Sequence, residues 1–224
     1  ESGYVALPCS QDHKRVGEGD TGLNTGGMGA YAPAPVATEA VRERAIAEIV
    51  EPMHAHLSSQ EIPYRGCLYV GLMIDSDGAP SVVEYNVRFG DPETQVTVPL
   101  ISSDLCELLL AVAEGRLSDS MPTFSDNHAL TVVLAAEGYP GPPVKGRSIS
   151  GDLSDHMDSD GCAFIHHAGT GHSEGVLIST GGRVLAATGI APSLAEAREL
   201  AYHKLSQVEL EGAHFRRDIG FRAL

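Results

Sequence analysis

The sequence contains no tryptophan, and aromatic residues make up only 5% of its 224 positions. It has no apolar run near the ~20 residues that a helix needs to cross a bilayer. It does not open with a basic and then apolar leader segment. The four cysteines are far apart and form no CxxC pair, which favours reduced, mostly buried thiols over a disulfide framework. We therefore expect a cytoplasmic protein without a membrane segment.

Positive charge is scarce, because 15 Lys and Arg residues stand against 30 Asp and Glu residues and give a net charge of −15. Such a balance disfavours nonspecific binding to nucleic acid or to an anionic membrane. It does not exclude a phosphate site, since a few local cations can serve one. The hydrophobic content of 42% is ordinary for a globular protein of one or two domains.

The first half of the chain predicts two helices and a hairpin. The sequence opens on Glu1 without an initiator methionine and reads as a strand already under way, so we interpret the chain as a fragment. A helix capped by Thr38 is expected to be interrupted at Pro52. The predicted elements are a strand at 3–9, a helix at 39–59, a hairpin of 67–74 with 80–86, and a helix from Ser103 to Gly115.

A polar, proline-containing linker near residue 122 predicts a domain boundary, giving domains at 1–121 and 122–224. Beyond it, apolar runs predict strands at 129–136, 162–167 and 183–190. Ser193 and Glu196 form a capping box that opens a last helix, with Val208 on its apolar face.

Residues 84–88 (EYNVR) carry the first chemical signal. In a strand, alternate side chains share a face, so Glu84, Asn86 and Arg88 project together. Mg²⁺ prefers oxygen ligands, often one or two from the protein with nucleotide phosphates completing the shell. Arg88 could bind a phosphate or carboxylate in two-pronged fashion. From the spacing alone, an ion pair of Glu84 with Arg88 on a solvated sheet face is an equal alternative.

The segment 10–31 carries the second signal, because SQDHKR is followed by six closely spaced glycines. Glycines let backbone N–H groups approach anionic oxygens, and Lys14 and Arg15 add positive charge. The segment contains no GxxxxGK[ST] phosphate loop. A merely connecting loop is the alternative.

These motifs resemble those of a known enzyme family. EYNVR resembles the ExNxR strand shared by ATP-grasp enzymes. The longer run RFGDPETQ, residues 88–95, resembles the signature of the phosphoribosylamine–glycine ligase family. The glycine-rich segment is similar to the same family, although Leu23 stands where the family has a proline. The resemblance implies an α/β (α+β) fold: a partial ATP-grasp domain with a largely antiparallel sheet and flanking helices, then a small mixed sheet-and-helix domain.

The resemblance also implies a set of site residues. The Glu and Asn of the strand hold the Mg²⁺ or Mn²⁺ that bridges the ATP phosphates in this family, so Glu84 and Asn86 are the implied metal ligands. We expect catalytic anion contacts from Lys14, Arg15 and Arg88. The further residues expected to bind substrate are Asp12, Asp91, Glu93, Gly26 and Gly27.

The implied activity is the ATP-dependent ligation of glycine to phosphoribosylamine through a glycyl phosphate, with release of ADP, in purine biosynthesis. The resemblance extends along the whole chain but covers about half of the family's length. It leaves out the amino-terminal domain and the lid that contacts adenine. We therefore expect the chain alone to be inactive, and its partner to be the amino-terminal half of the same protein.

Two other hypotheses remain open. A different ATP-grasp ligase or carboxylase could share the ExNxR strand, although the run RFGDPETQ argues against it. Alternatively, the chain could be a non-catalytic fragment that binds Mg²⁺ or phosphates and pairs with a separate polypeptide.

Overall fold

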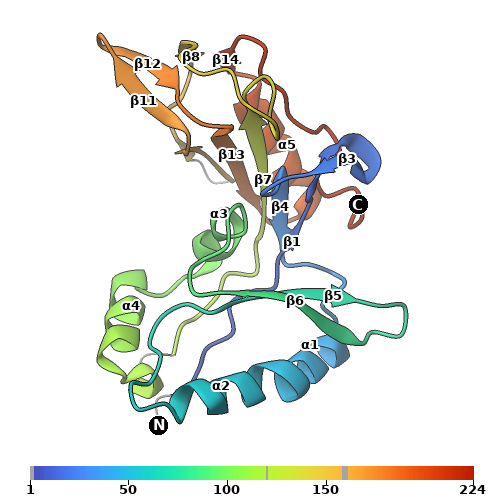
Figure 1. Ribbon diagram of the computed structural model, residues 1–224, viewed down its shortest axis with the longest axis vertical. Helices are drawn as coiled ribbons and strands as arrows, with labels where there is room; N and C mark the ends of the chain where they lie inside the picture. The colour runs from blue at the N-terminus through green and yellow to red at the C-terminus, as the bar shows by residue number, and fades with distance from the viewer. Residues whose placement is uncertain (1–2, 120, 158–160) are drawn as a thin grey trace. The chain divides into compact units, whose positions relative to one another are not determined.

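The computed structural model describes residues 3–119, 121–157 and 161–224 (Figure 1), and the chain divides into two compact units. Unit 1 comprises Glu1–Cys9, Ala34–Gly90 and Ile101–Ser125. Unit 2 comprises Ser10–Pro33, Asp91–Leu100 and Asp126–Leu224. The chain passes from unit 1 to unit 2 for the last time after Ser125, near the domain boundary predicted at residue 122. The contiguous division at that boundary differs from these units, because two earlier segments fold with the C-terminal residues.

The helical layer of unit 1 follows the predicted helix closely. It consists of α1 (Glu39–Ala45), a π-helical turn η2 (Ile46–Val50) and α2 (Glu51–Ser58). The Thr38 hydroxyl accepts a hydrogen bond from the Val41 N–H and caps α1. The π-helical turn precedes Pro52, which lacks the N–H that a regular helix would use. The predicted interruption is thus confirmed as a change of helix type.

The predicted hairpin of unit 1 is also confirmed, as β5 (Tyr69–Ile74) paired antiparallel with β6 (Pro80–Asn86). Asp75 fixes the turn, because its Oδ1 accepts from the N–H groups of Asp77 at 2.9 Å and Ala79 at 2.8 Å. A register shift opposite Gly71 leaves an extra residue in β6. Beyond the shift, the strand keeps its alternation up to Asn86.

The second helix of unit 1, α4 (Leu105–Glu114), has the ends that the sequence indicates. Asp104 caps its start by accepting from the Glu107 N–H at 3.0 Å. Gly115 ends it with a φ of 73°, which suits glycine. Short 3₁₀ turns, η4 (Leu117–Asp119) and η3 (Val98–Leu100), lie elsewhere in the chain. None of the described helices is long and apolar enough to cross a membrane.

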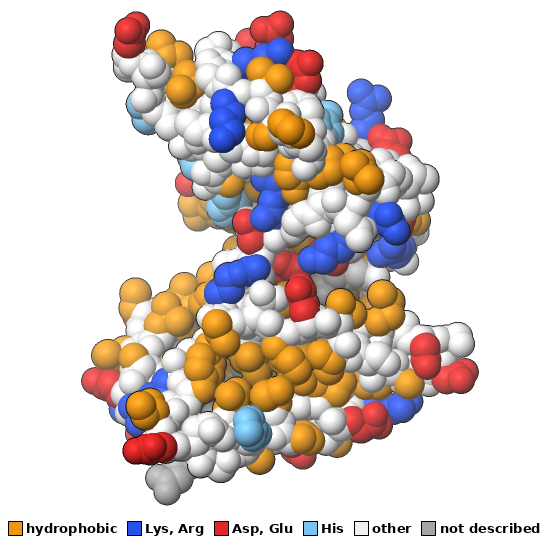
Figure 2. All heavy atoms as spheres, viewed as in Figure 1, with side chains coloured by type: hydrophobic (Ala, Val, Ile, Leu, Met, Phe, Trp, Pro, Cys, Tyr) orange, Lys and Arg blue, Asp and Glu red, His pale blue; other side chains and the backbone are white. Residues whose placement is uncertain are grey.

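Unit 1 exposes hydrophobic side chains on its hairpin. Met73 is 64% exposed, Val83 64% and Val87, just after β6, 74%. Figure 2 shows hydrophobic side chains gathered on the visible face of this unit. A β-sheet of two strands is rarely stable alone in water, and independently folded domains rarely expose an apolar surface of this kind.

Unit 2 is built on a six-stranded sheet in which every adjacent pair of strands is antiparallel. The strands, in spatial order, are β1 (Gln11–Asp12), β4 (Gly29–Ala32), β7 (His128–Ala135), β13 (Arg183–Ala191), β10 (Cys162–His167) and β9 (His156–Met157). The three strands predicted after residue 122 are confirmed as β7, β10 and β13. Because β1 and β4 join this sheet, the glycine-rich segment belongs to unit 2. The antiparallel sheets with flanking helices confirm the predicted fold class.

A helix covers this sheet. The predicted capping box is present, and α5 (Leu194–Leu205) packs on β13 and β7. A short helix, α3 (Thr94–Thr97), packs on β4 and β7. The core that these elements enclose includes Ala30, Ala32, Val96, Leu100, Ala129 and Ile190.

Two sequence-based assignments are wrong. Val208 does not extend the last helix, because α5 ends at Leu205 and Val208 pairs with Gly151 through β14 (Val208–Leu210) and β8 (Ile149–Gly151). The strand expected at 3–9 is absent from the described residues of that segment, and pairing begins only at Gln11. Pro8 lacks a backbone donor, which disfavours a paired strand there.

Candidate functional site

The two basic residues predicted to contact anions lie at the start of a small hairpin in unit 2. This hairpin, the basic loop (residues 13–24), contains β2 (Arg15–Gly17), a 3₁₀ turn η1 (Glu18–Asp20) and β3 (Thr21–Asn24). Lys14 Nζ lies 2.8 Å from Asp12 Oδ2. The Arg15 guanidinium donates to the Gly22 carbonyl oxygen at 2.8 Å. Both side chains are exposed, so both cations can meet an anion from solvent.

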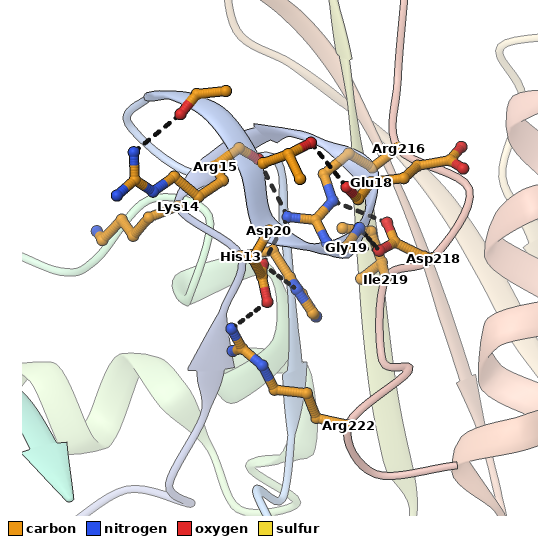
Figure 3. A network of polar contacts seen from close by, with 12 residues as sticks. His13, Lys14, Arg15, Glu18, Gly19, Asp20, Arg216, Asp218, Ile219 and Arg222 are labelled. Atoms are coloured by element: carbon orange, nitrogen blue, oxygen red, sulfur yellow. Dashed lines mark hydrogen bonds and ion pairs between the residues drawn. The ribbon is translucent and has the colours of Figure 1, made fainter.

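A polar network around Arg216 supports the basic loop on the side away from Lys14 and Arg15 (Figure 3). The buried Arg216 guanidinium donates to Asp20 Oδ1 at 2.9 Å and to both carboxylate oxygens of Asp218. Asp20 also accepts from Arg222. In Figure 3 the side chains of Lys14 and Arg15 point away from Arg216. The network therefore supports the loop and leaves its cations outside.

His13 lies at the base of the loop and is fully buried. Its Nε2 accepts a hydrogen bond from the Gly220 N–H at 3.0 Å, and its Nδ1 lies 3.6 Å from Asp20 Oδ1. Burial, with the nearby Arg216 and Arg222 charges, lowers the pKa of His13 to about 4. The ring is therefore neutral at pH 7, with Nε2 as an acceptor. It acts as a structural link between the loop and the C-terminal segment.

We expect His13→Gln to flatten the pH dependence of stability between pH 6.5 and pH 4. The pKa of His13 is about 4 when folded and near its ordinary 6.5 when unfolded. The unfolded state therefore binds the proton first as the pH falls. Above pH 6.5 the titration of His13 does not lower the free energy of unfolding of the wild type. Between pH 6.5 and pH 4, protonation of His13 in the unfolded state lowers this free energy by about 3 kcal/mol. Glutamine keeps an acceptor for Gly220 but does not titrate.

The measurement is urea unfolding followed by circular dichroism at several pH values. Asp218 stays ionised throughout this window: burial alone would raise its pKa, but hydrogen bonds from Arg216 and Gly19 bring it to about 2. Equal slopes for wild type and variant would contradict the assignment to His13.

A second network joins the RFGDPETQ segment to the glycine-rich segment within unit 2. Arg183 donates to both carboxylate oxygens of Asp91, at 3.2 and 3.0 Å, and to the carbonyl oxygens of Asp91 and Gly26. The Gly26 N–H donates to the Tyr139 hydroxyl at 2.9 Å. Gln95 also donates to Asp91, at 3.1 Å. These contacts fix Asp91 and Gly26 side by side.

The neighbouring glycine and glutamate shape the same turn. Gly27 has a φ of 119°, and a Cβ there would lie 2.4 Å from Pro92 Cδ, so the close approach requires glycine. Its N–H donates to Thr25 Oγ1. Glu93 is buried, and its carbonyl oxygen accepts from the N–H groups of Val96 and Thr97 at the start of α3. The N–H groups of Gly26 and Gly27 thus serve internal hydrogen bonds in this structure.

The residues predicted to hold a metal lie at the end of β6 in unit 1. Glu84 pairs with Gly71 and Asn86 pairs with Tyr69, so both side chains lie on one face of the hairpin. Glu84 is exposed and Asn86 is half-buried. Arg88 is exposed and donates to the Phe89 carbonyl oxygen at 2.8 Å. The alternative ion pair of Glu84 with Arg88 is absent from the contacts between described residues.

Glu84 and Asn86 fit a divalent cation that takes only part of its shell from protein. A carboxylate oxygen and an amide oxygen are the hard ligands that Mg²⁺ or Mn²⁺ prefers. Among the described residues, no group of three or more His, Cys, Asp or Glu side chains could hold a metal on its own. A site that is completed by nucleotide phosphates is consistent with both observations.

Sequence reasoning missed the residues that organise the site. Arg183, Tyr139 and Arg216 each bond to a segment that lies more than a hundred positions earlier in the chain. Each belongs to a stretch that is similar to the ligase family, so the resemblance could have marked these three residues as candidates. No local pattern indicates which partner such a side chain has.

Two family models match the chain. One, described as the ATP-grasp (A) domain of phosphoribosylglycinamide synthetase, matches residues 2–94. The other, described as the C domain of the same synthetase, matches residues 129–222. The chain belongs to the phosphoribosylglycinamide synthetase family. The two matched ranges leave the predicted linker near residue 122 between them.

Named relatives of this family agree. The chain is 49% identical over 221 residues to a phosphoribosylamine–glycine ligase of Chlorobaculum tepidum, covering 99% of the chain and 51% of the relative. It is 47% identical to the "bifunctional purine biosynthetic protein PUR2,5" of Pichia angusta, covering 98% of the chain and 28% of that protein. The chain thus spans about half the length of the curated ligases it matches.

Solved structures place the fold in the same family. The crystal structure of phosphoribosylamine–glycine ligase from Thermotoga maritima aligns with a TM-score of 0.82 and 37% identity, over 97% of this chain and 52% of that one. The biotin carboxylase domain of a Hydrogenobacter thermophilus 2-oxoglutarate carboxylase aligns with a TM-score of 0.57 at 21% identity, over 84% of this chain and 40% of that one. The carboxylase shares the fold alone, so a carboxylase function is not favoured.

Proposed function

We propose that the complete protein ligates glycine to 5-phosphoribosylamine at the expense of ATP, giving glycinamide ribonucleotide, ADP and phosphate. The supporting observation is the oxygen pair of Glu84 and Asn86 on one face of β6, in a chain of this family. Mg²⁺ or Mn²⁺ is the proposed cofactor, and the reaction belongs to purine biosynthesis. A cytoplasmic location is proposed as well, in keeping with four cysteines that are free thiols.

The proposed reaction has two steps. In the first, a glycine carboxylate oxygen attacks the γ-phosphorus of ATP, the bond to the β-phosphate oxygen breaks, and ADP leaves. In the second, the 1-amino group of phosphoribosylamine attacks the carbonyl carbon of glycyl phosphate. Phosphate departs with the electron pair of the broken C–O bond, and the amine loses a proton to solvent or phosphate. No covalent bond to the protein is required.

The residues of the chain have separate roles in these steps. Glu84 and Asn86 hold the cation, which offsets negative charge on the phosphates when bound. Lys14, Arg15 and Arg88 donate to the oxygens of the transferred phosphoryl group, where charge develops. Preorganised donors of this kind need little rearrangement during reaction.

The substrate contacts proposed for unit 2 are less direct. The Asp12 carboxylate, beside Lys14, and the Asp91 carboxylate, half-exposed beside Arg183, are acceptors for the amine or the ribose hydroxyls. Gly26, Gly27 and Glu93 contribute by shaping the turn that presents these groups. Each of these roles rests on the family resemblance and on the geometry of the turn.

The remaining half of the protein is the proposed partner of unit 1. The exposed apolar side chains of the hairpin, including Val83 and Val87, are a surface that further chain can cover. The nucleotide site forms on the face of β6 that carries Glu84 and Asn86, together with a lobe that this chain does not supply. In this proposal the chain supplies the metal ligands and the remaining half supplies the adenine contacts.

The test compares the 224-residue chain with the complete protein. With ATP, Mg²⁺, glycine and phosphoribosylamine, the complete protein should release ADP only when both glycine and the amine are present. The chain alone should give no product, because it lacks the adenine and lid contacts. Glycine-independent ADP release by the complete protein would refute the proposed substrate. Turnover by the chain alone would refute the need for a second half.

A further inference from the structure

A buried arginine connects the C-terminal segment to the basic loop. Arg216 lies after β14 and is 1% exposed. Its Nε and one terminal nitrogen donate to Asp218 Oδ1 at 2.8 Å and Oδ2 at 2.7 Å. This two-pronged pair fixes the plane of the guanidinium, which a single hydrogen bond could not do.

The other terminal nitrogen of Arg216 holds the loop itself. It donates to the backbone carbonyl oxygen of Arg15 at 3.1 Å and to Asp20 Oδ1 at 2.9 Å. Asp218 contributes in parallel, because its Oδ2 accepts from the Gly19 N–H at 2.8 Å. One buried cation and its partner therefore fix the loop at its start and at its turn.

Arg216 is in turn anchored to the body of unit 2. The Tyr202 hydroxyl, on α5, donates to the Arg216 carbonyl oxygen at 2.7 Å and accepts from the Ile219 N–H at 3.1 Å. Burial raises the pKa of Tyr202 to about 12, so the hydroxyl keeps its proton. Because α5 packs on β13 and β7, these hydrogen bonds connect the basic loop to the central sheet of unit 2.

We propose that Arg216 is a positioning residue, which sets the backbone at Arg15 so that the cations of Lys14 and Arg15 face the reacting phosphoryl group. Arg216 does not contact substrate, since its guanidinium is buried and its donors are used within the protein. Figure 3 shows the two exposed cations on the opposite side of the loop from Arg216. What the cations do there rests on the proposed function.

The test uses the complete protein with Arg216→Lys. Lysine keeps the charge, but a single ammonium group cannot reproduce a planar fork that reaches Asp218, Asp20 and a carbonyl oxygen. We expect kcat to fall roughly 100-fold, because a displacement of about 1 Å at a catalytic group has this effect. The KM for ATP should change little, since the loss is confined to the transition state.

A matched control separates positioning from stability. Lys204 is also a buried cation of unit 2, 3% exposed, and it lies 3.0 Å from Asp152 Oδ2, outside the network of the basic loop. Lys204→Met should lower the melting temperature while kcat stays near the wild-type value. An equal loss of kcat in this control would overturn the inference.

A second measurement does not depend on turnover. Hydrogen–deuterium exchange of the backbone amides in residues 15–24 should be at least about tenfold faster in Arg216→Lys and unchanged in Lys204→Met. Unchanged exchange in Arg216→Lys overturns the inference even if activity falls. A wild-type protein without ligase activity would refute the proposed function, and the exchange data would still decide whether Arg216 positions the loop.

A second variant covers the case in which Arg216→Lys does not fold. Asp218→Asn leaves Arg216 in place but removes the charge that fixes its plane, and it weakens the acceptor for the Gly19 N–H. Faster exchange in residues 15–24 is again the expected result. A folded Asp218→Asn protein with wild-type exchange in the loop would overturn the inference.

Discussion

Glu84→Ala in the complete protein should lower kcat roughly 1000-fold or more while the protein stays folded. Glu84 is exposed on β6, and alanine there removes no packing. The variant loses the charged member of an oxygen pair, and the carboxylate is the stronger of the two ligands for a hard cation. The loss should appear mainly in kcat, because charge on the phosphates grows as the phosphoryl group is transferred.

A matched control and a binding measurement make this test specific. Glu61→Ala removes another exposed carboxylate of unit 1, in the turn after α2, and should leave kcat unchanged. Electron paramagnetic resonance of Mn²⁺ with ATP present should show weaker metal binding in Glu84→Ala than in Glu61→Ala. Turnover of Glu84→Ala at the wild-type rate would remove the metal assignment.

Lys14→Ala should lower kcat by roughly 100- to 1000-fold, as expected when one preorganised donor to a developing charge is lost. The Lys14 side chain is 45% exposed, but its partner Asp12 is only 19% exposed and its Oδ2 is buried. Loss of the ammonium group leaves that oxygen without its cation, so alanine should also destabilise the protein by about 1–3 kcal/mol. The measurement is steady-state kinetics with thermal unfolding in parallel.

Two comparisons sharpen the result for Lys14. Lys145→Ala removes an exposed lysine from an irregular segment of unit 2 and should leave the kinetics unchanged. Lys14→Arg keeps a positive charge and should recover part of the lost rate. If Lys14→Ala raised the KM for glycine or ATP without lowering kcat, the residue would serve ground-state binding instead.

Local sequence signals predicted much of the fold. The ends of α4 follow from Asp104 and Gly115, and the start of α5 follows from the Ser193–Glu196 capping box, since each involves residues within one helical turn. The hairpin of β5 and β6 was predictable from an apolar run on each side of a turn. Such elements need no knowledge of distant residues.

The membership of the two units could not be predicted in this way. The segment 10–33 reads as a glycine-rich loop, yet it supplies β1 and β4 to a sheet whose other strands start more than ninety residues later. Pairing across such a distance depends on the whole core, and periodicity within the segment does not encode it. The same limit explains why Val208 was assigned to a helix.

The candidate site shows the same difference between local features, which the sequence predicts, and long-range contacts, which it does not. Strand alternation predicted that Glu84 and Asn86 share one face, and the pairing of β6 with β5 agrees, whereas their proposed role as metal ligands came from the family motif. The sequence did not predict the pairing of Asp91 with Arg183, which lie 92 positions apart. It also did not predict that Arg216 supports the basic loop. Motifs indicate which residues we propose to carry the chemistry, whereas tertiary packing determines what holds them in place.

The long connection between Arg15 and Arg216 also sets an order of events during synthesis. The two residues are 201 positions apart, so at 5–20 residues per second the ribosome delivers the anchor about 10 to 40 s after the loop. Until then Asp20 and the Arg15 carbonyl oxygen lack the buried partner that supports the loop. A nascent chain can thus give the basic loop its buried support only after Arg216 and Asp218 have been synthesised.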